Sequence, residues 1–245
     1  QNLTKKFGDF VANNNINLQV DEQEIKCIVG ENGAGKSTLM NMLYGVFKPT
    51  SGKVLLKGEE LAMNSPTDAI RHGIGMVHQH FKLVPSFTVY ENILLGSEIT
   101  KNGLIDRKQE IEKVRELIEE YHFQIDPMAK IQDISVGLCQ QVEILKMLYR
   151  NVDILILDEP TAVLTPQEVD QLMENLKALR DQGKTIMVIT HKLREVMYLS
   201  DSVTVIKAGQ VIGNVKTKDT CESELAQMMV GRDVVLTVKN EDGPA

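Results

Sequence analysis

The sequence predicts an α/β protein built around a mainly parallel β-sheet. Short apolar runs typical of buried strands alternate with segments whose apolar residues recur at helical spacing, and this alternation favours a parallel sheet covered by helices. A glycine-rich loop stands between one of these strands and the helix that follows it. Residues 86–150 contain helix-like segments and no strong strand signal, which predicts a helical lobe inserted into the α/β core.

The first elements can be placed in order along the chain. The residues up to about position 25, together with Lys53–Lys57, predict strands of an accessory antiparallel sheet. The run Glu24–Val29 is short, apolar and bounded by polar residues, so it is predicted to be a strand. From Lys36 to Tyr44 the apolar residues recur at helical spacing, and the glycine that follows can end this helix.

Capping signals locate the next helices. Ser65 followed by Pro66 predicts the start of a short helix. Both Asp106–Gln109 and Thr165–Glu168 match the capping box, and Gly183 can terminate the helix that begins at the second of them. Apolar runs and periodicity predict the remaining elements, which are strands over 73–77, 152–157 and 184–190, a hairpin of 202–207 with 210–215, and a last helix over 222–230.

Length and composition narrow the class of protein. A chain of 245 residues that is 42% hydrophobic fits one large domain, which we expect to span residues 1–232 with a polar linker or tail over 233–245. The formal charge of −7 argues against a nucleic-acid partner, because phosphate binding needs clustered Lys and Arg. No run approaches the roughly 18 apolar residues of a membrane span. Three cysteines without metal-ligand spacing favour reduced thiols in a cytosolic protein.

The glycine-rich loop matches G-x-x-x-x-G-K-[ST], the phosphate-binding P-loop. Its glycines let successive backbone N–H groups point at one spot, at a helix N-terminus that favours anions. Lys36 adds a positive charge for the β- and γ-phosphates, and the Ser37 hydroxyl can ligate Mg²⁺. The plain alternative is a glycine-rich turn after a strand. The predicted nucleotide-binding residues are Gly30, Glu31, Asn32, Gly33, Ala34, Gly35, Lys36, Ser37 and Thr38.

A pair of carboxylates follows the strand predicted over 152–157. Asp158 and Glu159 stand at its carboxyl end, which is the Walker B arrangement. The aspartate can hold Mg²⁺, and the glutamate can polarise an attacking water. Acidic pairs at the start of a loop are common, so the pair alone leaves both readings open. Together with the P-loop it favours a nucleotide site, because Mg²⁺ on two phosphates needs such a carboxylate.

From residue 3 to about 232 the chain resembles the nucleotide-binding domains of ABC transporters. Ile134–Leu138 stands at the position of the family signature, before the Walker B strand and at the start of a helix, and Ala162–Thr165 stands at the D-loop. Gln79 matches the Q-loop glutamine, His191 the switch histidine, and Phe7 the aromatic residue that stacks on adenine. Each has a purely structural alternative: Ser135 and Thr165 as helix N-caps, His191 as a surface histidine, and Phe7 as a core aromatic.

This resemblance implies a P-loop NTPase with a RecA-like core, an antiparallel β lobe and a helical lobe. It further implies that the chain binds ATP and Mg²⁺, with Ser37, Gln79 and Asp158 at the metal and Glu159, His191 and Gln79 serving hydrolysis. In the family, Ser135 and Gly137 contact the γ-phosphate held by an opposite domain. The expected partners are therefore a second ATPase domain, either a C-terminal half or a homodimer mate, and the subunits of a transmembrane permease. The expected location is the cytoplasmic face of the cell membrane.

Departures from the family pattern indicate a subfamily. Val136 replaces a usual glycine of the signature, Leu138 the usual glutamine, and Thr165 the usual aspartate of the D-loop. The surrounding residues resemble importers of simple sugars and nucleosides, and the stretch Met76–Phe81 resembles the nucleoside branch. Members of that subfamily usually carry two such domains in tandem, and this chain resembles the N-terminal half. The alternative is an ABC-type ATPase in DNA repair or translation, which predicts basic patches or long coiled-coil inserts that the sequence lacks.

The Q-loop segment also suggests a docking surface. Phe81, Leu83, Val84 and Phe87 form an apolar group beside the predicted helical lobe, and we expect them to be exposed and to receive a short helix of a permease. The alternative is that these four side chains pack within the lobe.

Overall fold

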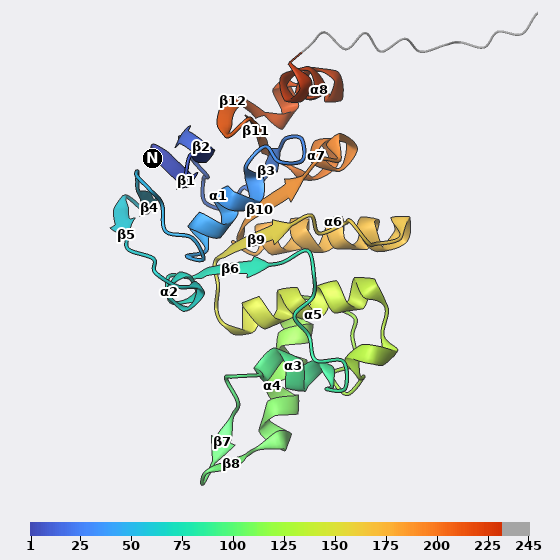
Figure 1. Ribbon diagram of the computed structural model, residues 1–245. Helices are drawn as coiled ribbons and strands as arrows, with labels where there is room; N and C mark the ends of the chain where they lie inside the picture. Colours follow the sequence, from blue (N-terminus) through green and yellow to red (C-terminus); the bar gives the residue numbers. More distant parts are fainter. Residues whose placement is uncertain (232–245) are drawn as a thin grey trace, which may run out of the picture.

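The computed structural model describes residues 1–231, and its centre is one six-stranded sheet in the order β12-β11-β3-β10-β9-β6 (Figure 1). The five strands from β11 to β6 run parallel, and β12 is the antiparallel edge strand. This confirms the predicted α/β class. The strands span Ile25–Val29 (β3), Ile74–Val77 (β6), Ile154–Asp158 (β9), Thr185–Thr190 (β10), Ser202–Lys207 (β11) and Gln210–Lys216 (β12).

The central strands are apolar on both faces because each face carries its own core. All residues of β3 and β10 are buried, as expected for a parallel sheet covered on both sides. Cys27 and Val29 belong to the core beneath the helices α5 to α8, whereas Ile28 between them belongs to the core beneath α1 and α2. The helices span Lys36–Leu43 (α1), Pro66–Arg71 (α2), Val136–Tyr149 (α5), Pro166–Asp181 (α6), Leu193–Leu199 (α7) and Glu222–Val230 (α8).

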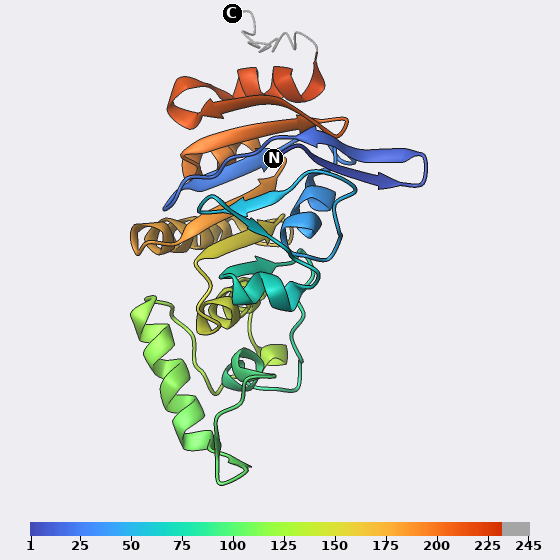
Figure 2. The same ribbon diagram turned by 90° about the vertical axis from the view of Figure 1, so that its left-hand side faces the viewer.

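The accessory strands are antiparallel, as the sequence predicts, and they form two short ribbons. Strand β1 (Leu3–Phe7) pairs with β2 (Phe10–Ile16), and β4 (Val54–Leu56) pairs with β5 (Glu59–Leu61). A single bridge between Thr4 and Ser51 links the first ribbon to the chain that leads into the second. Figure 2 shows the β1–β2 ribbon, in dark blue, running alongside the sheet.

Residues between β6 and β9 form the helical part of the molecule. It contains α3 (Val89–Leu94), α4 (Arg107–Glu120), a 3₁₀ turn over Ile131–Asp133, and α5. A short hairpin of β7 (Thr100–Lys101) and β8 (Leu104–Ile105) interrupts this segment, for which the sequence predicts helices and no strong strand. Its turn is Asn102-Gly103, and both residues have a positive φ. Asn-Gly is a strong hairpin signal, but the flanking strands of two residues each are too short to show an alternating apolar pattern in the sequence. The hairpin and α4 extend away from the sheet (Figure 2).

Helix α7 and the domain bounds remain to be compared with the sequence predictions. Helix α7 was not anticipated, although its seven residues follow directly on the predicted strand β10. No helix among residues 1–231 combines the length and apolar character needed to cross a bilayer. The linker or tail expected over 233–245 lies outside the described residues, and the division into one domain over 1–232 with a lobe over 86–150 stays a prediction.

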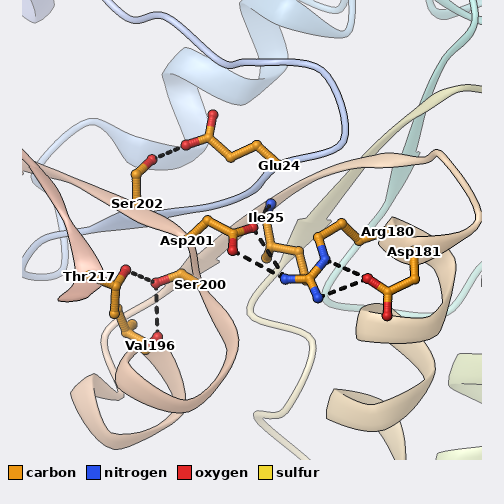
Figure 3. A network of polar contacts seen from close by, with 9 residues as sticks. All are labelled: Glu24, Ile25, Arg180, Asp181, Val196, Ser200, Asp201, Ser202 and Thr217. Atoms are coloured by element: carbon orange, nitrogen blue, oxygen red, sulfur yellow. Dashed lines mark hydrogen bonds and ion pairs between the residues drawn. The ribbon is translucent and has the colours of Figure 1, made fainter.

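A polar network that runs from the surface into the core fixes the end of the sheet where β3 and β11 begin (Figure 3). The Asp201 carboxylate accepts a hydrogen bond of 2.8 Å from the Ile25 amide and pairs with the Arg180 guanidinium at 3.1 Å. Deeper in, Ser202 hydrogen-bonds Glu24 and receives a 2.8 Å hydrogen bond from the Lys26 ammonium group. These hydrogen bonds and ion pairs satisfy polar groups whose burial would otherwise destabilise the fold. The opposite edge of the sheet, where the parallel strands have their carboxyl ends, is left for chemistry.

Candidate nucleotide site

The loop from β3 to α1 is shaped by glycines that no other residue could replace. Gly35 has a φ of 101°, and a Cβ built there would lie 2.6 Å from the Ala12 carbonyl oxygen. A Cβ at Gly30 would collide with the carbonyl oxygen of Ile206 on β11, and the Gly209 amide donates a 2.9 Å hydrogen bond to Ala34. The loop is therefore supported from below by the β11–β12 turn, which keeps its amides directed toward the edge of the sheet.

Lys36, the first residue of α1, is buried and folded back over the loop. Its Nζ donates hydrogen bonds to the carbonyl oxygens of Gly30 at 2.7 Å and Glu31 at 3.0 Å. Burial lowers the pKa of Lys36, and the nearby Glu159 and Asp158 carboxylates oppose that shift. An ammonium group has three donors, so one proton beyond the two bound carbonyls is available to an anion.

The two carboxylates predicted at the end of β9 lie beside this loop. Burial raises the pKa of Asp158, and the adjacent Glu159 charge adds to the increase, while a hydrogen bond from the Ser37 hydroxyl opposes it. Glu159 sits at a φ of 47°, with its amide donating to the Ile189 carbonyl of β10 at 3.0 Å. A non-glycine residue in this region stores strain, and such strain concentrates at functional sites.

His191 meets Glu159 directly. Its Nδ1 lies 2.9 Å from one carboxylate oxygen of Glu159, while the other oxygen, Oε2, is buried without a protein partner. The Glu159 side chain is only 13% exposed, and the histidine side chain is 51% exposed. One oxygen is thus fixed by the histidine, and the other is a buried acceptor whose hydrogen-bonding capacity is unused.

These groups converge on a cavity of about 500 Å³. Ten predicted residues line it: Asn32, Gly33, Gly35, Lys36, Ser37, Thr38, Gln79, Asp158, Glu159 and His191. Three further lining residues, Phe10, Ala12 and Ala162, were not predicted as site residues. A larger cavity of about 600 Å³ is lined largely by aliphatic side chains, away from these groups. The smaller cavity is the candidate site, because the charged and hydroxyl groups meet there.

Phe7 does not line this cavity, whereas Phe10 does. The Phe7 ring packs edge-on against Phe47 at 5.5 Å, and the Lys5 ammonium lies 5.1 Å from its centroid. Phe7 and Phe10 are nonetheless directly paired across the β1–β2 ribbon, so their side chains leave the same face of it. Phe10 was not predicted as a site residue, because its place at the cavity depends on this pairing; the two-residue Gly8-Asp9 turn between the phenylalanines is the local signal for it.

Ser135 and Gly137 also lie outside the cavity lining. The Ser135 hydroxyl caps α5 by accepting the Leu138 amide at 3.3 Å, as its structural alternative predicts. The same hydroxyl and the Gly137 amide both donate to the carboxylate of Glu168 on α6. Glu168 completes the expected capping box with Thr165, and its contact with the signature segment was not foreseen.

Gln79 is exposed, and the loop after it is fixed to the helical part by two buried side chains. The Glu143 carboxylate on α5 accepts a 2.5 Å hydrogen bond from the Lys82 amide, and Asn92 on α3 pairs with both the amide and the carbonyl of Val84. Neither side chain could be predicted from local pattern: Glu143 and Lys82 are 61 positions apart, and Asn92 lies inside a helix, where capping and periodicity give no signal for a contact with a loop.

The expected exposure of the apolar group beside this loop is only partly present. Phe81 and Leu83 are half-buried and pack against the core beneath α3 to α8, and Val84 is half-buried as well. Phe87 is the exposed member, with 38% of its surface accessible. The alternative, in which the group packs within the helical part, therefore describes Phe81 and Leu83.

The strand–loop–helix with its lysine, and the carboxylates at the end of the neighbouring strand, define a P-loop NTPase. The pattern of the ABC transporter family matches residues 13–162, and the chain belongs to this family.

Relatives of known role share most of this sequence. The nucleoside import ATP-binding protein NupA of Lactococcus lactis subsp. cremoris is 53% identical over 232 residues, covering 95% of this chain and 46% of its own. The guanosine import ATP-binding protein NupO of Bacillus subtilis is 54% identical over 233 residues, with the same two coverages of 95% and 46%. This chain thus spans about half the length of these relatives.

A solved structure extends the comparison to the fold. It is a dimeric post-hydrolysis state of an ATP-binding cassette bound to ADP and Pi. The two chains superpose with a TM-score of 0.73 at 28% sequence identity, over 89% of this chain and 97% of the other.

Proposed function

We propose that this chain binds Mg-ATP in the 500 Å³ cavity and hydrolyses it to drive uptake of a nucleoside or a simple sugar through a transmembrane permease. The observation that carries the proposal is the convergence of Lys36, Asp158, Glu159 and His191 on the edge of the sheet that ends in the P-loop. The phosphates would lie on the loop amides, near the remaining Lys36 proton. The adenine would lie toward the aromatic pair of the β1–β2 ribbon.

The donor set near the phosphates fits Mg²⁺. Ser37, Asp158 and Gln79 offer a hydroxyl, a carboxylate and an amide oxygen, which are the hard ligands this ion prefers. Among residues 1–231 no cluster of three or more His, Cys, Asp and Glu could hold a metal by itself, so the nucleotide's own oxygens would complete the coordination. When bound, Mg²⁺ supplies charge neutralisation for the phosphates.

Hydrolysis would depend on Glu159 as the group that accepts the water's proton. Its Oε1 is fixed by His191, and its buried Oε2 has no protein partner, so we assign Oε2 as the acceptor for a water that enters with the nucleotide. His191 would act by positioning Glu159, and the hydrogen bond from the Glu159 amide to the Ile189 carbonyl helps to hold the backbone at its positive φ.

The position of Ser135 and Gly137 outside the cavity suggests that the chain works with a second ATPase domain. Ser135 and Gly137 do not reach the cavity of their own chain, so their expected γ-phosphate contact requires a second ATPase domain. The dimeric relative supports such a pair, and the import proteins NupA and NupO support a permease and a nucleoside as solute. Their greater length supports the chain being one half of a tandem protein. We place it on the cytoplasmic side of a membrane, peripheral to the permease.

Nucleotide binding is tested by replacing the P-loop lysine. Lys36→Ala removes the charge that faces the phosphates, so Mg-ATP affinity measured by calorimetry should fall well over tenfold, or by more than about 1.4 kcal/mol. Lys57→Ala is the matched control, because Lys57 is 76% exposed and lies on the β4–β5 ribbon. Unchanged affinity in Lys36→Ala would contradict the proposed site.

The solute class is tested in cells. A strain carrying Lys36→Ala in the chromosomal gene should lose uptake of either labelled uridine or labelled ribose, and uptake of an unrelated amino acid serves as control. Normal uptake of both solutes would contradict the transport role.

Docking to the permease is tested by Phe87→Asp, because Phe87 is the exposed member of the apolar group. It should reduce co-purification with the permease and leave ATP affinity unchanged. Wild-type co-purification would contradict docking at this loop.

A further inference from the structure

The N-terminus of α5 is already occupied by an anionic group of the same chain. Glu168, in the first turn of α6, directs one carboxylate oxygen, Oε1, at the Ser135 hydroxyl at 2.8 Å and at the Gly137 amide at 2.9 Å. Its other oxygen accepts hydrogen bonds from the amide and hydroxyl of Thr165, at 3.0 and 3.1 Å. These four donors hold the pKa of Glu168 at about 2, so the group is a carboxylate at neutral pH.

The fit of this carboxylate is close. A Cβ built on Gly137 would lie 2.7 Å from the carboxyl carbon and from Oε1 of Glu168, nearer than such atoms approach. Gly137 is buried, and its φ is not in the left-handed region, so backbone conformation does not require a glycine here. The glycine is needed for the approach of Glu168.

The Ser135 hydroxyl and the Gly137 amide each have only one proton to donate. Neither group can therefore form a full hydrogen bond to a second acceptor while Glu168 holds them. An incoming phosphate oxygen would occupy the position of Oε1, and the two negative charges would repel each other at contact distance. Glu168 and a phosphate therefore exclude each other at the start of α5.

We propose that Glu168 is an internal competitor for the ATP of the partner domain: it occupies Ser135 and Gly137 in the single chain and must leave them before two domains close on nucleotide. The inference rests on the proposed function, because it assumes that these two residues serve a γ-phosphate held by another domain. Glu168 sets the ATP concentration at which the pair forms. Because Glu168 lies on α6, its release also removes the polar contacts that join the start of α5 to α6.

The test is Glu168→Gln in a chain that also carries Glu159→Gln, which keeps bound ATP intact. The amide retains the shape of the carboxylate, but its neutral oxygen accepts weaker hydrogen bonds and repels phosphate less. Association of the 245-residue chain is followed by sedimentation velocity over a range of Mg-ATP concentrations. The Mg-ATP concentration at half-association should fall by about threefold to tenfold, since charge-assisted hydrogen bonds are roughly twice as strong as neutral ones.

Two controls separate competition from helix capping. Glu91→Gln makes the same change in the capping box of α3, where the carboxylate is bound to Thr88. Thr165→Ala weakens the cap of α6 and removes one donor to Glu168, but it keeps both donors from the signature segment, Ser135 and Gly137. Neither control should lower the half-association concentration.

The outcomes distinguish the inference from the function beneath it. If the parent chain binds Mg-ATP by calorimetry, but Glu168→Gln does not lower the nucleotide or chain concentration needed for association, the competition is refuted. A rise in that concentration would show that Glu168 instead prepares α5 for its partner. A parent chain that fails to bind Mg-ATP would overturn the proposed function itself.

Discussion

Replacing Glu159 by glutamine separates the chemistry of the site from its binding. The amide keeps the size of the side chain, and its oxygen can still accept the hydrogen bond that joins Glu159 to His191 at 2.9 Å. The substitution replaces the buried, unpartnered Oε2, the oxygen we assign to the attacking water, by an amide nitrogen that cannot accept a proton. The fold of the loop should survive, because the backbone contact to Ile189 does not involve the side chain.

The expected magnitude follows from the loss of a general base. Such groups contribute about 10² to 10⁴ in rate, which corresponds to roughly 3–5 kcal/mol in the barrier. ATP affinity should stay the same or increase, because Lys36 and the loop amides are untouched and one negative charge leaves the site. The Glu159 charge also helps to raise the pKa of Asp158, so Asp158 should ionise more readily in the variant.

Phosphate release under single-turnover conditions measures the rate, and calorimetry measures the affinity. Asp153→Asn is the matched control, because Asp153 directly precedes β9 at the opposite end from Glu159 and its side chain is 79% exposed. Its turnover should equal that of the wild type. A Glu159→Gln chain that hydrolyses ATP within twofold of the wild type would refute the assignment of Glu159 as the base.

Three other predictions follow from the contacts described above. Phe7→Ala and Phe10→Ala should each weaken ATP binding by about 1–3 kcal/mol, as loss of base stacking does, and leave tripolyphosphate binding unchanged; equal losses for both ligands would rule out adenine stacking. Asp201→Ala leaves the buried Ile25 amide without its acceptor, so urea denaturation should show a loss of about 1–3 kcal/mol with normal ATP affinity, and an unchanged midpoint would contradict this. The pKa of Glu168 is depressed from 4.5 to about 2, so its contribution to stability is complete above pH 4.5 and is lost as the pH falls toward 2. The stability difference between wild type and Glu168→Gln should shrink over that window, and a constant difference would show that the charge is not involved.

The predictable part of the site is the part encoded locally. Gly30–Thr38 was identified from nine consecutive residues because a strand, a glycine loop and a helix follow one another in the sequence. Asp158 could be placed at the same edge because the carboxyl ends of parallel strands share one edge of a sheet. The sheet and most helices follow from periodicity and caps in the same way.

The missed contacts depend on residues brought together from distant segments. Glu168 is recognisable from sequence as the third residue of a capping box, yet its approach to Ser135 spans 33 positions. Phe10 lines the cavity because of its cross-strand position opposite Phe7. Capping and periodicity report on a few turns of chain, so they carry no information about which helix ends will meet.

The support beneath the phosphate loop has a consequence for how the protein is made. Gly30 rests against Ile206, and Ala34 accepts the Gly209 amide, so the loop near the start of the chain is supported by residues translated much later. Segments fold as they leave the ribosome, with the N-terminal part first. A nascent chain that ends before Gly209 therefore carries the whole P-loop sequence without its base. We therefore expect nucleotide binding to be a late event in synthesis, which begins only after Gly209 has left the ribosome.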